Sequence, residues 1–192
     1  MARAPGNQPM IFGIGLSKTG TNSLNEALTL AGHPSVHFPS CELMLAGKFD
    51  EAFNGAVAAT DISVTAFYRE LDETYPGSKF ILTVRDRQSW LQSIETHMLR
   101  RPAESLVPGH PIGDVRQLVY GMRGFDRGAF EAAYDLHRAA VLAYFNGRDD
   151  DLLIMDVCGG DGWDVLCPFI GVRAPRRAFP SLNKTRVEHQ AA

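Results

Sequence analysis

The stretch GIGLSKTGTNS, residues 13–23, constrains the fold of this 192-residue chain more than any other feature. It follows the apolar run 10–12 and precedes a stretch with helical spacing. Glycines at such a junction allow the tight turn that connects a buried strand to a helix. The unpaired amides and the positive dipole end at the start of that helix favour an anion. The sequence therefore predicts a strand, a glycine turn and a helix whose amino end binds a phosphate-like group.

Strands and helices alternate along the rest of the chain. Apolar runs that end in turn residues predict strands at 10–16, 56–60, 79–84 and 152–157. Helical spacing predicts helices at 22–31, 41–53, 64–75, 87–99 and 127–145, and a further short helix after the glycine turn that follows the last strand. This alternation predicts an α/β fold with a mainly parallel central sheet flanked by helices.

We expect residues 1–192 to form a single domain, because the chain is too short for two substantial cores. The segment 100–113 holds three prolines and two glycines, which predicts a long irregular loop that acts as a lid. The C-terminal segment 172–192 carries five cationic residues against the single Glu188. This basic segment is either a solvated tail or a flap that closes on an anion.

Composition and charge narrow the class of partner and the compartment. Hydrophobic residues make up 45% of the chain and charged residues 21%, which is typical of a globular protein. The net charge of −3 argues against a protein that coats nucleic acid. Cys41, Cys158 and Cys167 are odd in number and show no CxxC spacing, which favours a reducing cytoplasm. The first apolar run is broken by glycines, so we expect neither export nor membrane insertion.

The lysine of the glycine loop stands in an unusual position. In nucleoside triphosphatases the pattern GxxxxGK[ST] puts the lysine directly after the second glycine. Here Thr21 and Asn22 follow that glycine, and Lys18 precedes Gly20 by two residues. We expect Lys18 to lie across the loop beside the bound group, where it can neutralise charge that develops on a bridging oxygen. Such an arrangement suits a transfer that needs no metal.

The segment SKTGTNS, residues 17–23, resembles the 5′-phosphosulfate loop of the sulfotransferases that use 3′-phosphoadenosine 5′-phosphosulfate (PAPS). The segments GWDVLCPFIG at 162–171 and FPSLNKT at 179–185 also resemble small bacterial-type members of this family. The resemblance implies a P-loop-containing nucleoside-triphosphate-hydrolase-like fold, PAPS as donor, adenosine 3′,5′-bisphosphate as product and no required metal. It implies that Lys18 assists the departure of the bisphosphate. The loop residues that it assigns to the cofactor are Ser17, Lys18, Thr19, Gly20, Thr21, Asn22 and Ser23.

A second anion site is predicted at the end of the strand in KFILTVRDRQSWLQS, residues 79–93. Arg85 follows this strand directly, and a guanidinium can bind phosphate through two parallel hydrogen bonds. Family members place an arginine here and a serine eight residues later, both on the 3′-phosphate, and Arg85 with Ser93 resembles that pair. The alternative for Arg85 is a salt bridge to Asp86 or Asp61.

Trp90 and Lys184 are two further candidates for contact with the cofactor. Trp90 could stack on adenine, but a tryptophan at this place in a helix is more often a core anchor, and we favour the core. Larger cytosolic sulfotransferases use a basic, glycine-rich C-terminal segment on the 3′-phosphate, and the present chain lacks that pattern. Lys184 is the candidate to replace it.

Transfer to a hydroxyl needs a base near the attacking oxygen. Many cytosolic sulfotransferases carry a histidine at the end of the strand that precedes the 3′-phosphate strand. Asp61 stands at this place, which resembles bacterial relatives, and is our candidate base. Its structural alternatives are to cap the following helix or to hold Arg85. His37 and His97 are rival bases, and neither an HExxH motif nor a Cys/His cluster predicts a metal site.

Together these features predict a cytoplasmic sulfotransferase that moves a sulfuryl group from PAPS to a small-molecule or carbohydrate acceptor, with a hydroxyl as the favoured acceptor group and an amine as the alternative. Nucleic acids are not among the expected partners. Two other classes stay open. A magnesium-dependent nucleotide kinase or triphosphatase with a degenerate loop would need Asp156 or Asp61 for the metal. A non-catalytic protein could keep the nucleotide pocket as a scaffold.

Overall fold

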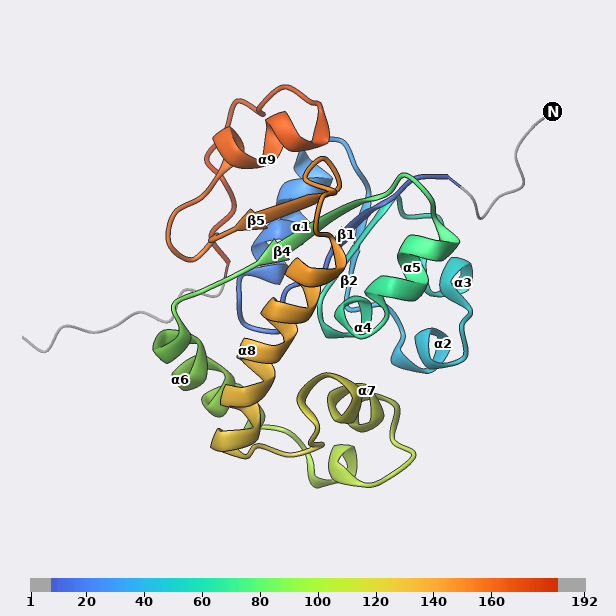
Figure 1. Ribbon diagram of the computed structural model, residues 1–192, viewed down its shortest axis with the longest axis vertical. Helices are drawn as coiled ribbons and strands as arrows, with labels where there is room; N and C mark the ends of the chain where they lie inside the picture. The colour runs from blue at the N-terminus through green and yellow to red at the C-terminus, as the bar shows by residue number, and fades with distance from the viewer. Residues whose placement is uncertain (1–7, 183–192) are drawn as a thin grey trace, which may run out of the picture.

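The computed structural model describes residues 8–182, in which five parallel strands form one central sheet (Figure 1). The strands are β1 (Ile11–Gly13), β2 (Ser35–His37), β3 (Ala58–Thr60), β4 (Lys79–Thr83) and β5 (Leu152–Met155). Their order is β2-β3-β1-β4-β5. The central strand β1 pairs with β3 on one side and with β4 on the other, so a crevice opens at its carboxyl end. The predicted α/β class with a parallel sheet is confirmed.

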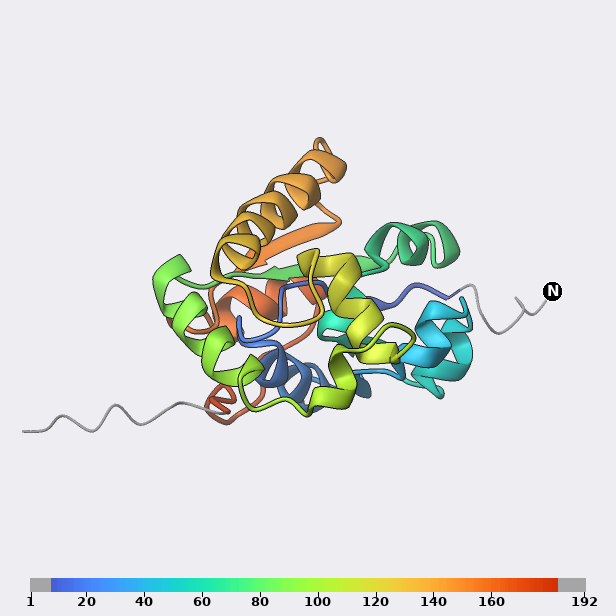
Figure 2. The same cartoon turned by 90° about the horizontal axis from the view of Figure 1, so that it is seen from below.

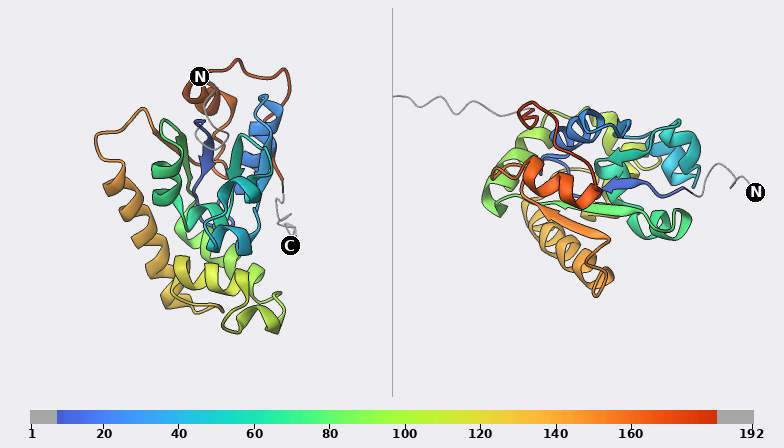
Figure 3. Two further views of the ribbon diagram at one scale, coloured as in Figure 1. Left: turned by 90° about the vertical axis from the view of Figure 1, so that its right-hand side faces the viewer. Right: turned by 90° about the horizontal axis from the view of Figure 1, so that it is seen from above.

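Helices cover both faces of the sheet and the carboxyl ends of its strands. They are α1 (Thr21–Leu30), α2 (Cys41–Leu45), α3 (Phe49–Phe53), α4 (Ile62–Thr65), α5 (Tyr68–Thr74), α6 (Arg87–Met98), α7 (Pro111–Tyr120), α8 (Arg127–Tyr144) and α9 (Trp163–Ile170), with a 3-10 helix at Ala103–Leu106. Helices α1 and α9 pack on one face and α5 and α8 on the other (Figure 2, Figure 3). Helices α6 and α7 meet the first turns of α8 beyond the strand ends.

Alternate side chains of the strands supply a hydrophobic core on each face of the sheet. In β1, Ile11 packs with Leu24 of α1, whereas Phe12 faces the other side and stacks near Phe80 with ring centroids 5.4 Å apart. This alternation is the two-residue period of a strand. Phe12 is fully buried, and burial of such a side chain contributes roughly 1.5–3 kcal/mol. A third cluster around Trp90 joins α6, α7 and α8.

Two predicted helices are each divided in the structure. The helix predicted at 41–53 is split into α2 and α3, because Gly47 between them adopts φ +69 and ends the first helix. The helix predicted at 64–75 is split into α4 and α5. Its first part ends at Thr65, whose hydroxyl donates to the Gly15 carbonyl over 2.8 Å and so connects α4 to the glycine loop.

Three elements were not predicted from the sequence, namely β2, the 3-10 helix and α7. Strand β2 has only three residues, too few to display a period, and it forms an edge of the sheet by pairing with β3. The segment 100–113, predicted to be irregular, contains the 3-10 helix and the start of α7. Pro111 begins α7 at a position where a proline is tolerated, since its missing amide is not needed there. The strands predicted at 10–16 and 152–157 are shorter than expected.

Candidate active site

The glycine loop between β1 and α1 packs tightly against the end of β4. A Cβ atom at Gly15 would lie 1.9 Å from the hydroxyl oxygen of Thr83, so only glycine fits there. Gly20 has φ +102, and a side chain at Gly20 would lie 2.8 Å from Cβ of Val157. Lys18 also has a positive φ, +74, which is uncommon for a residue with a side chain. The predicted strand, glycine turn and helix are therefore all present.

The amino end of α1 carries no capping side chain. Its N-cap residue is Gly20, and no side chain of the described residues accepts a hydrogen bond from the first turn. The first intrahelical bond runs from the Leu24 amide, so the amides of Thr21, Asn22 and Ser23 have no helical partner. This end presents unpaired donors and a positive dipole end, which together favour an anion.

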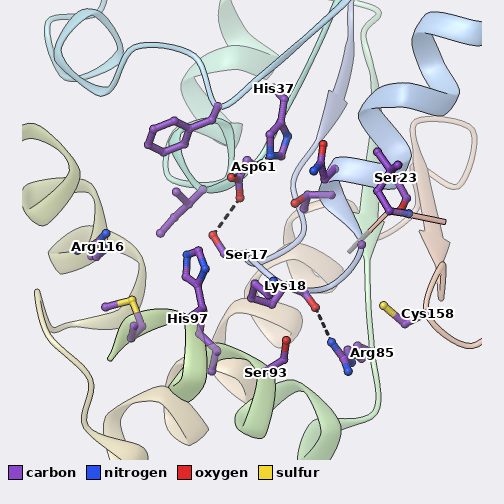
Figure 4. Close-up of a pocket in the computed structure, with 18 of the residues that line it drawn as sticks. Ser17, Lys18, Ser23, His37, Asp61, Arg85, Ser93, His97, Arg116 and Cys158 are labelled. Carbon is purple, nitrogen blue, oxygen red and sulfur yellow. Dashed lines mark hydrogen bonds and ion pairs between the residues drawn. The ribbon is translucent and has the colours of Figure 1, made fainter. Parts of the chain in front are cut away.

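Two side chains from the β4–α6 region hold the carbonyl groups of the glycine loop. Trp90 is fully buried, and its indole nitrogen donates to the Ser17 carbonyl over 2.9 Å. Arg85 Nη1 donates to the Lys18 carbonyl over 3.2 Å. Trp90 is therefore a core anchor, as expected, and it also fixes the loop. Figure 4 shows the Lys18 side chain between Arg85 and Ser17, within the cavity.

Arg85 and Ser93 both line the cavity, one two residues after the end of β4 and the other almost two turns along the next helix (Figure 4). Arg85 Nε donates to the Ser89 hydroxyl over 2.8 Å. Asp86 accepts from the Ser89 amide over 2.8 Å and caps α6, and Asp61 bonds elsewhere. Arg85 thus has no carboxylate partner within the described chain, and the alternative salt bridge is not formed. Its Nη2 remains available to a ligand.

Asp61 directly follows β3, and its carboxylate faces the loop. Oδ1 accepts a hydrogen bond from the Ser17 hydroxyl over 2.9 Å, and Oδ2 lies 3.4 Å from Nε2 of His37. The side chain neither caps α4 nor bonds to Arg85, so neither structural alternative holds. The backbone of Asp61 has φ 90 and ψ 179, a conformation that side chains rarely adopt and that costs roughly 1–3 kcal/mol. Such strain is concentrated at functional positions.

His37 reaches the site because β2 pairs with β3. This pairing puts His37 opposite Thr60, and its Nδ1 lies 2.9 Å from the Thr60 hydroxyl oxygen. Its other ring nitrogen faces Asp61. Both ring nitrogens therefore have partners that fix the orientation of the imidazole. Nothing in the local residue pattern indicates β2, so the pairing of His37 with Asp61 was not predictable from it.

His97 lines the opposite wall of the cavity, on α6. Arg101, one turn later, contacts both ring nitrogens, with Nη2 3.0 Å from Nδ1. Burial, and then the positive charges of Arg101 and Lys18, lower the pKa of His97 to about 4. The imidazole is therefore neutral at physiological pH. A base with so low a pKa has no advantage over a carboxylate, which weakens the case for His97.

Three residues assigned to the cofactor from the sequence need separate comment. The hydroxyl of Thr19 donates to a loop carbonyl over 2.7 Å and bonds to the Thr83 hydroxyl over 2.6 Å, so this side chain faces the sheet and not the cavity. The Ser23 hydroxyl lines the cavity but accepts from the Leu182 amide over 2.9 Å. Lys184 lies outside the described residues.

Neither a metal cluster nor a membrane-spanning helix is found in residues 8–182. Asp156, the metal ligand of the kinase alternative, accepts from the Gly159 amide over 2.7 Å in the turn after β5 and does not line the cavity. The described residues contain no group of three or more His, Cys, Asp or Glu that could hold a metal ion. The described helices include none that is both long and apolar enough to cross a bilayer.

Besides the apolar Ile112, the unpredicted helix α7 supplies two more polar side chains to the cavity, Arg116 and Tyr120. They lie four residues apart and therefore on one face of the helix. Both are buried, with 4% and 3% of their surface exposed. Arg116 Nη1 donates to the Ser105 hydroxyl over 3.1 Å, and the Tyr120 ring stacks on Phe130 with centroids 4.3 Å apart. An arginine on the buried face of a helix is a usable signal only when the helix itself is expected.

These side chains surround one cavity of about 330 Å³ between the carboxyl edge of the sheet and the helices α6 and α7 (Figure 4). Asp61 is the only carboxylate among the described residues that line it. The cations that line it are Lys18, Arg85, Arg101 and Arg116. This surplus of positive charge favours a ligand that carries several negative charges.

Comparison with known proteins decides the family. A family model described as "Sulfotransferase domain" matches residues 10–187. The chain belongs to this sulfotransferase family. The fold of this sulfotransferase is similar to that in the crystal structure of a sulfotransferase from Alicyclobacillus acidocaldarius, with a TM-score of 0.57 and 18% sequence identity over 97% of this chain and 88% of that chain. The comparison with curated proteins gives no match. The family resemblance found in the glycine loop is thus confirmed.

Proposed function

We propose that this sulfotransferase uses PAPS as its donor and transfers the sulfuryl group to a hydroxyl of a small-molecule or carbohydrate acceptor. The observation that carries the proposal is the presence of two separate places for an anion at neighbouring strand ends. One is the amino end of α1 after β1, and the other is Arg85 after β4. PAPS carries phosphate groups at its 5′ and 3′ positions, so two such places match one molecule.

The residues of the donor end fit this ligand. The term "donor end" is used here for the amino end of α1 together with Arg85 and Ser93. The glycine at position 15 leaves no room for a side chain, and the helix amides lack partners among the described residues, so backbone donors are free for the 5′-phosphate. Arg85 with its available Nη2 and Ser93 would hold the 3′-phosphate. When bound, PAPS supplies a sulfuryl group activated by its bond to phosphate.

The residues of the acceptor end fit a proton transfer. The term "acceptor end" is used here for the part of the cavity that is lined by Asp61, His37, His97, Arg116 and Tyr120. Asp61 can accept the proton of an acceptor hydroxyl, because its carboxylate is oriented by Ser17 and His37 on opposite oxygens. A positioned carboxylate acts as a base despite its modest basicity when the hydroxyl is held against it.

Lys18 lies between the two ends. The ion pairs of residues 8–182 include none with Lys18, so its ammonium is not neutralised by a carboxylate of the described chain. We infer that this charge stabilises the negative charge that grows on the donor phosphate during transfer. The hydrogen bond from the Arg85 guanidinium to the Lys18 carbonyl connects the lysine to the residue that would hold the 3′-phosphate.

The test is turnover with PAPS and a panel of hydroxyl acceptors, read as formation of adenosine 3′,5′-bisphosphate by chromatography. We expect Asp61→Asn to lower turnover by about 10²–10⁴-fold, because the amide cannot take the proton. Binding of adenosine 3′,5′-bisphosphate should stay within about threefold of the parent protein. The matched control is Asp149→Asn, an exposed aspartate outside the cavity. Unchanged turnover in Asp61→Asn would remove Asp61 from the role of base.

A further inference from the structure

The acceptor end contains a buried cation that the transfer itself does not explain. Arg116 exposes 4% of its surface, and its guanidinium stays protonated at any ordinary pH. Within residues 8–182 it has no ion-pair partner, and its one hydrogen bond goes to Ser105. A buried charge without a counter-ion is costly. Such an arrangement is expected where a ligand brings the missing charge.

The neighbouring titratable groups do not supply that charge. Burial, and then the carboxylate of Asp61, raise the pKa of Cys41 to about 11, so the thiol is neutral. Burial likewise raises the pKa of Tyr120, which keeps the phenol neutral. Burial and the positive charge of Arg101 lower the pKa of Arg116, and thus both oppose its charged form. The surroundings of Arg116 disfavour its charge rather than compensate it.

A second buried group at the same place also lacks a partner. The Tyr120 hydroxyl is buried close to Ser17, but no described residue meets it in good hydrogen-bond geometry. Buried hydroxyls are nearly always hydrogen-bonded in native proteins. Because Arg116 and Tyr120 lie one helical turn apart, α7 presents to one space a guanidinium without an ion-pair partner and a phenol hydroxyl without a hydrogen-bond partner among the described residues. These two hydrogen-bond donors together favour a ligand that carries an oxygen acceptor.

The walls beside these donors are apolar. Phe38, Ile62, Met98 and Ile112 line the same cavity. Sites of this kind bind an apolar body through the walls and fix its orientation through a few polar groups. Figure 4 shows Arg116 across the cavity from Arg85, so the donor phosphates and the unexplained cation belong to different ends.

We propose that Arg116, assisted by Tyr120, binds an anionic oxygen group of the acceptor, which is a small hydroxyl compound with an apolar body and a carboxylate or phosphate group. This inference rests on the proposed function, because the acceptor hydroxyl is taken to face Asp61 while the anion faces α7. Arg116 is then a specificity residue. It selects which hydroxyl compound is held against the base, and it takes no part in donor binding.

The test is calorimetric binding of matched acceptor pairs at saturating adenosine 3′,5′-bisphosphate. The pairs are 4-hydroxybenzoate with 4-hydroxybenzamide, and 6-hydroxyhexanoate with 6-hydroxyhexanamide; 4-hydroxyphenyl phosphate separates phosphate from carboxylate. We expect the parent protein to bind an anionic member about ten- to a hundredfold more tightly than its neutral analogue. Arg116→Met should abolish this preference, and Tyr120→Phe should reduce it severalfold, about the loss of one hydrogen bond.

Controls separate recognition from folding. Arg138→Met, an exposed arginine of α8 outside this cavity, should keep the preference. Arg116→Met should melt at the same or a higher temperature, because it removes an uncompensated buried charge. Arg116→Lys, which keeps the charge but loses the planar fork, should retain a weakened preference. These readouts would differ if Arg116 only supported the fold.

Each outcome bears on the proposal. Equal binding of acids and amides by the parent protein, or a preference that survives in Arg116→Met, overturns it. A matching loss of affinity for adenosine 3′,5′-bisphosphate in Arg116→Met would put this arginine at the donor end and also overturn it. If the parent protein does not bind the bisphosphate, both proposals fail. If it does bind and shows no anion preference, only the present one fails.

Discussion

The donor end and the acceptor end of the cavity are built in different ways. The donor end consists of backbone amides at the amino end of α1, of Arg85 two residues after β4, and of Ser93 on α6. The acceptor end combines Asp61 and His37, which stand at strand ends, with Arg116 and Tyr120 of α7, a helix that packs against α2, α4 and α8. Strand ends position most of the first, whereas the α7 side of the second depends on how α6, α7 and α8 pack. Acceptor specificity can therefore vary without disturbing the donor chemistry.

Lys18 lies at the boundary and offers the strongest test of this division. We expect Lys18→Met to lower turnover by about 10²–10³-fold, because the ammonium acts on charge that develops during transfer. Affinity for adenosine 3′,5′-bisphosphate should fall much less. Steady-state turnover and calorimetry on the same preparation measure the two effects, with the exposed Lys48→Met as control. Equal losses in turnover and affinity would make Lys18 a binding residue of the donor end alone.

Replacement of Arg85 should affect only the binding of the nucleotide at the donor end. We expect Arg85→Met to weaken binding of adenosine 3′,5′-bisphosphate by about ten- to a hundredfold and to leave binding of adenosine 5′-monophosphate nearly unchanged. Calorimetric titration with both nucleotides measures this discrimination. Arg87→Met, two residues away and paired on the surface with Asp135, is the matched control. A loss shared by both nucleotides would contradict the assignment of Arg85 to the 3′-phosphate.

Protonation of His97, at the acceptor end, has the smallest expected effect, and this effect is on the stability of the fold. The pKa of His97 is about 4 in the folded protein and about 6.5 in an unfolded chain. Between these values the unfolded state binds a proton that the folded state excludes, so stability falls as the pH falls from about 6.5 to about 4. Because the ring is partly exposed, we expect this component to be on the order of 1 kcal/mol.

Urea unfolding of the parent protein and of His97→Gln at pH 7 and pH 5 measures this component. The glutamine variant should lose less stability on acidification than the parent protein, since it has no imidazole to protonate. Identical pH dependence of the two proteins would show that His97 is not buried against Arg101 and Lys18 as described.

The difference between residues at strand ends and residues on packed helices also explains how much of the site could be predicted from the sequence. The glycine loop, Asp61 and Arg85 were found because each begins within two residues of the end of an apolar strand, and local order along the chain is enough to recognise that. The pairing of His37 with Asp61 depends on β2, a three-residue edge strand with no detectable period. Local sequence therefore predicts strand ends well and the contacts between them poorly.

Arg116 and Tyr120 of the acceptor end were missed for a physical reason. Pro111 begins α7 within a segment rich in proline and glycine, so turn signals hid the helix. Arg116 is charged, and a charged residue is normally assigned to the solvent face. Thr19 shows the opposite error, since it belongs to the recognised motif but its side chain bonds within the sheet edge. In both cases tertiary packing, rather than residue type, decides which side chains reach the cavity.

The central claim is that the donor end recognises a nucleotide with phosphates at both the 3′ and 5′ positions. Calorimetric titration of the parent protein with adenosine 3′,5′-bisphosphate, adenosine 5′-monophosphate and ATP, each with and without magnesium, tests it most directly. We expect the bisphosphate to bind at least about tenfold more tightly than the monophosphate, independently of magnesium. Tight binding of ATP that requires magnesium, with no preference for the 3′-phosphate, would contradict the account and favour a kinase or triphosphatase.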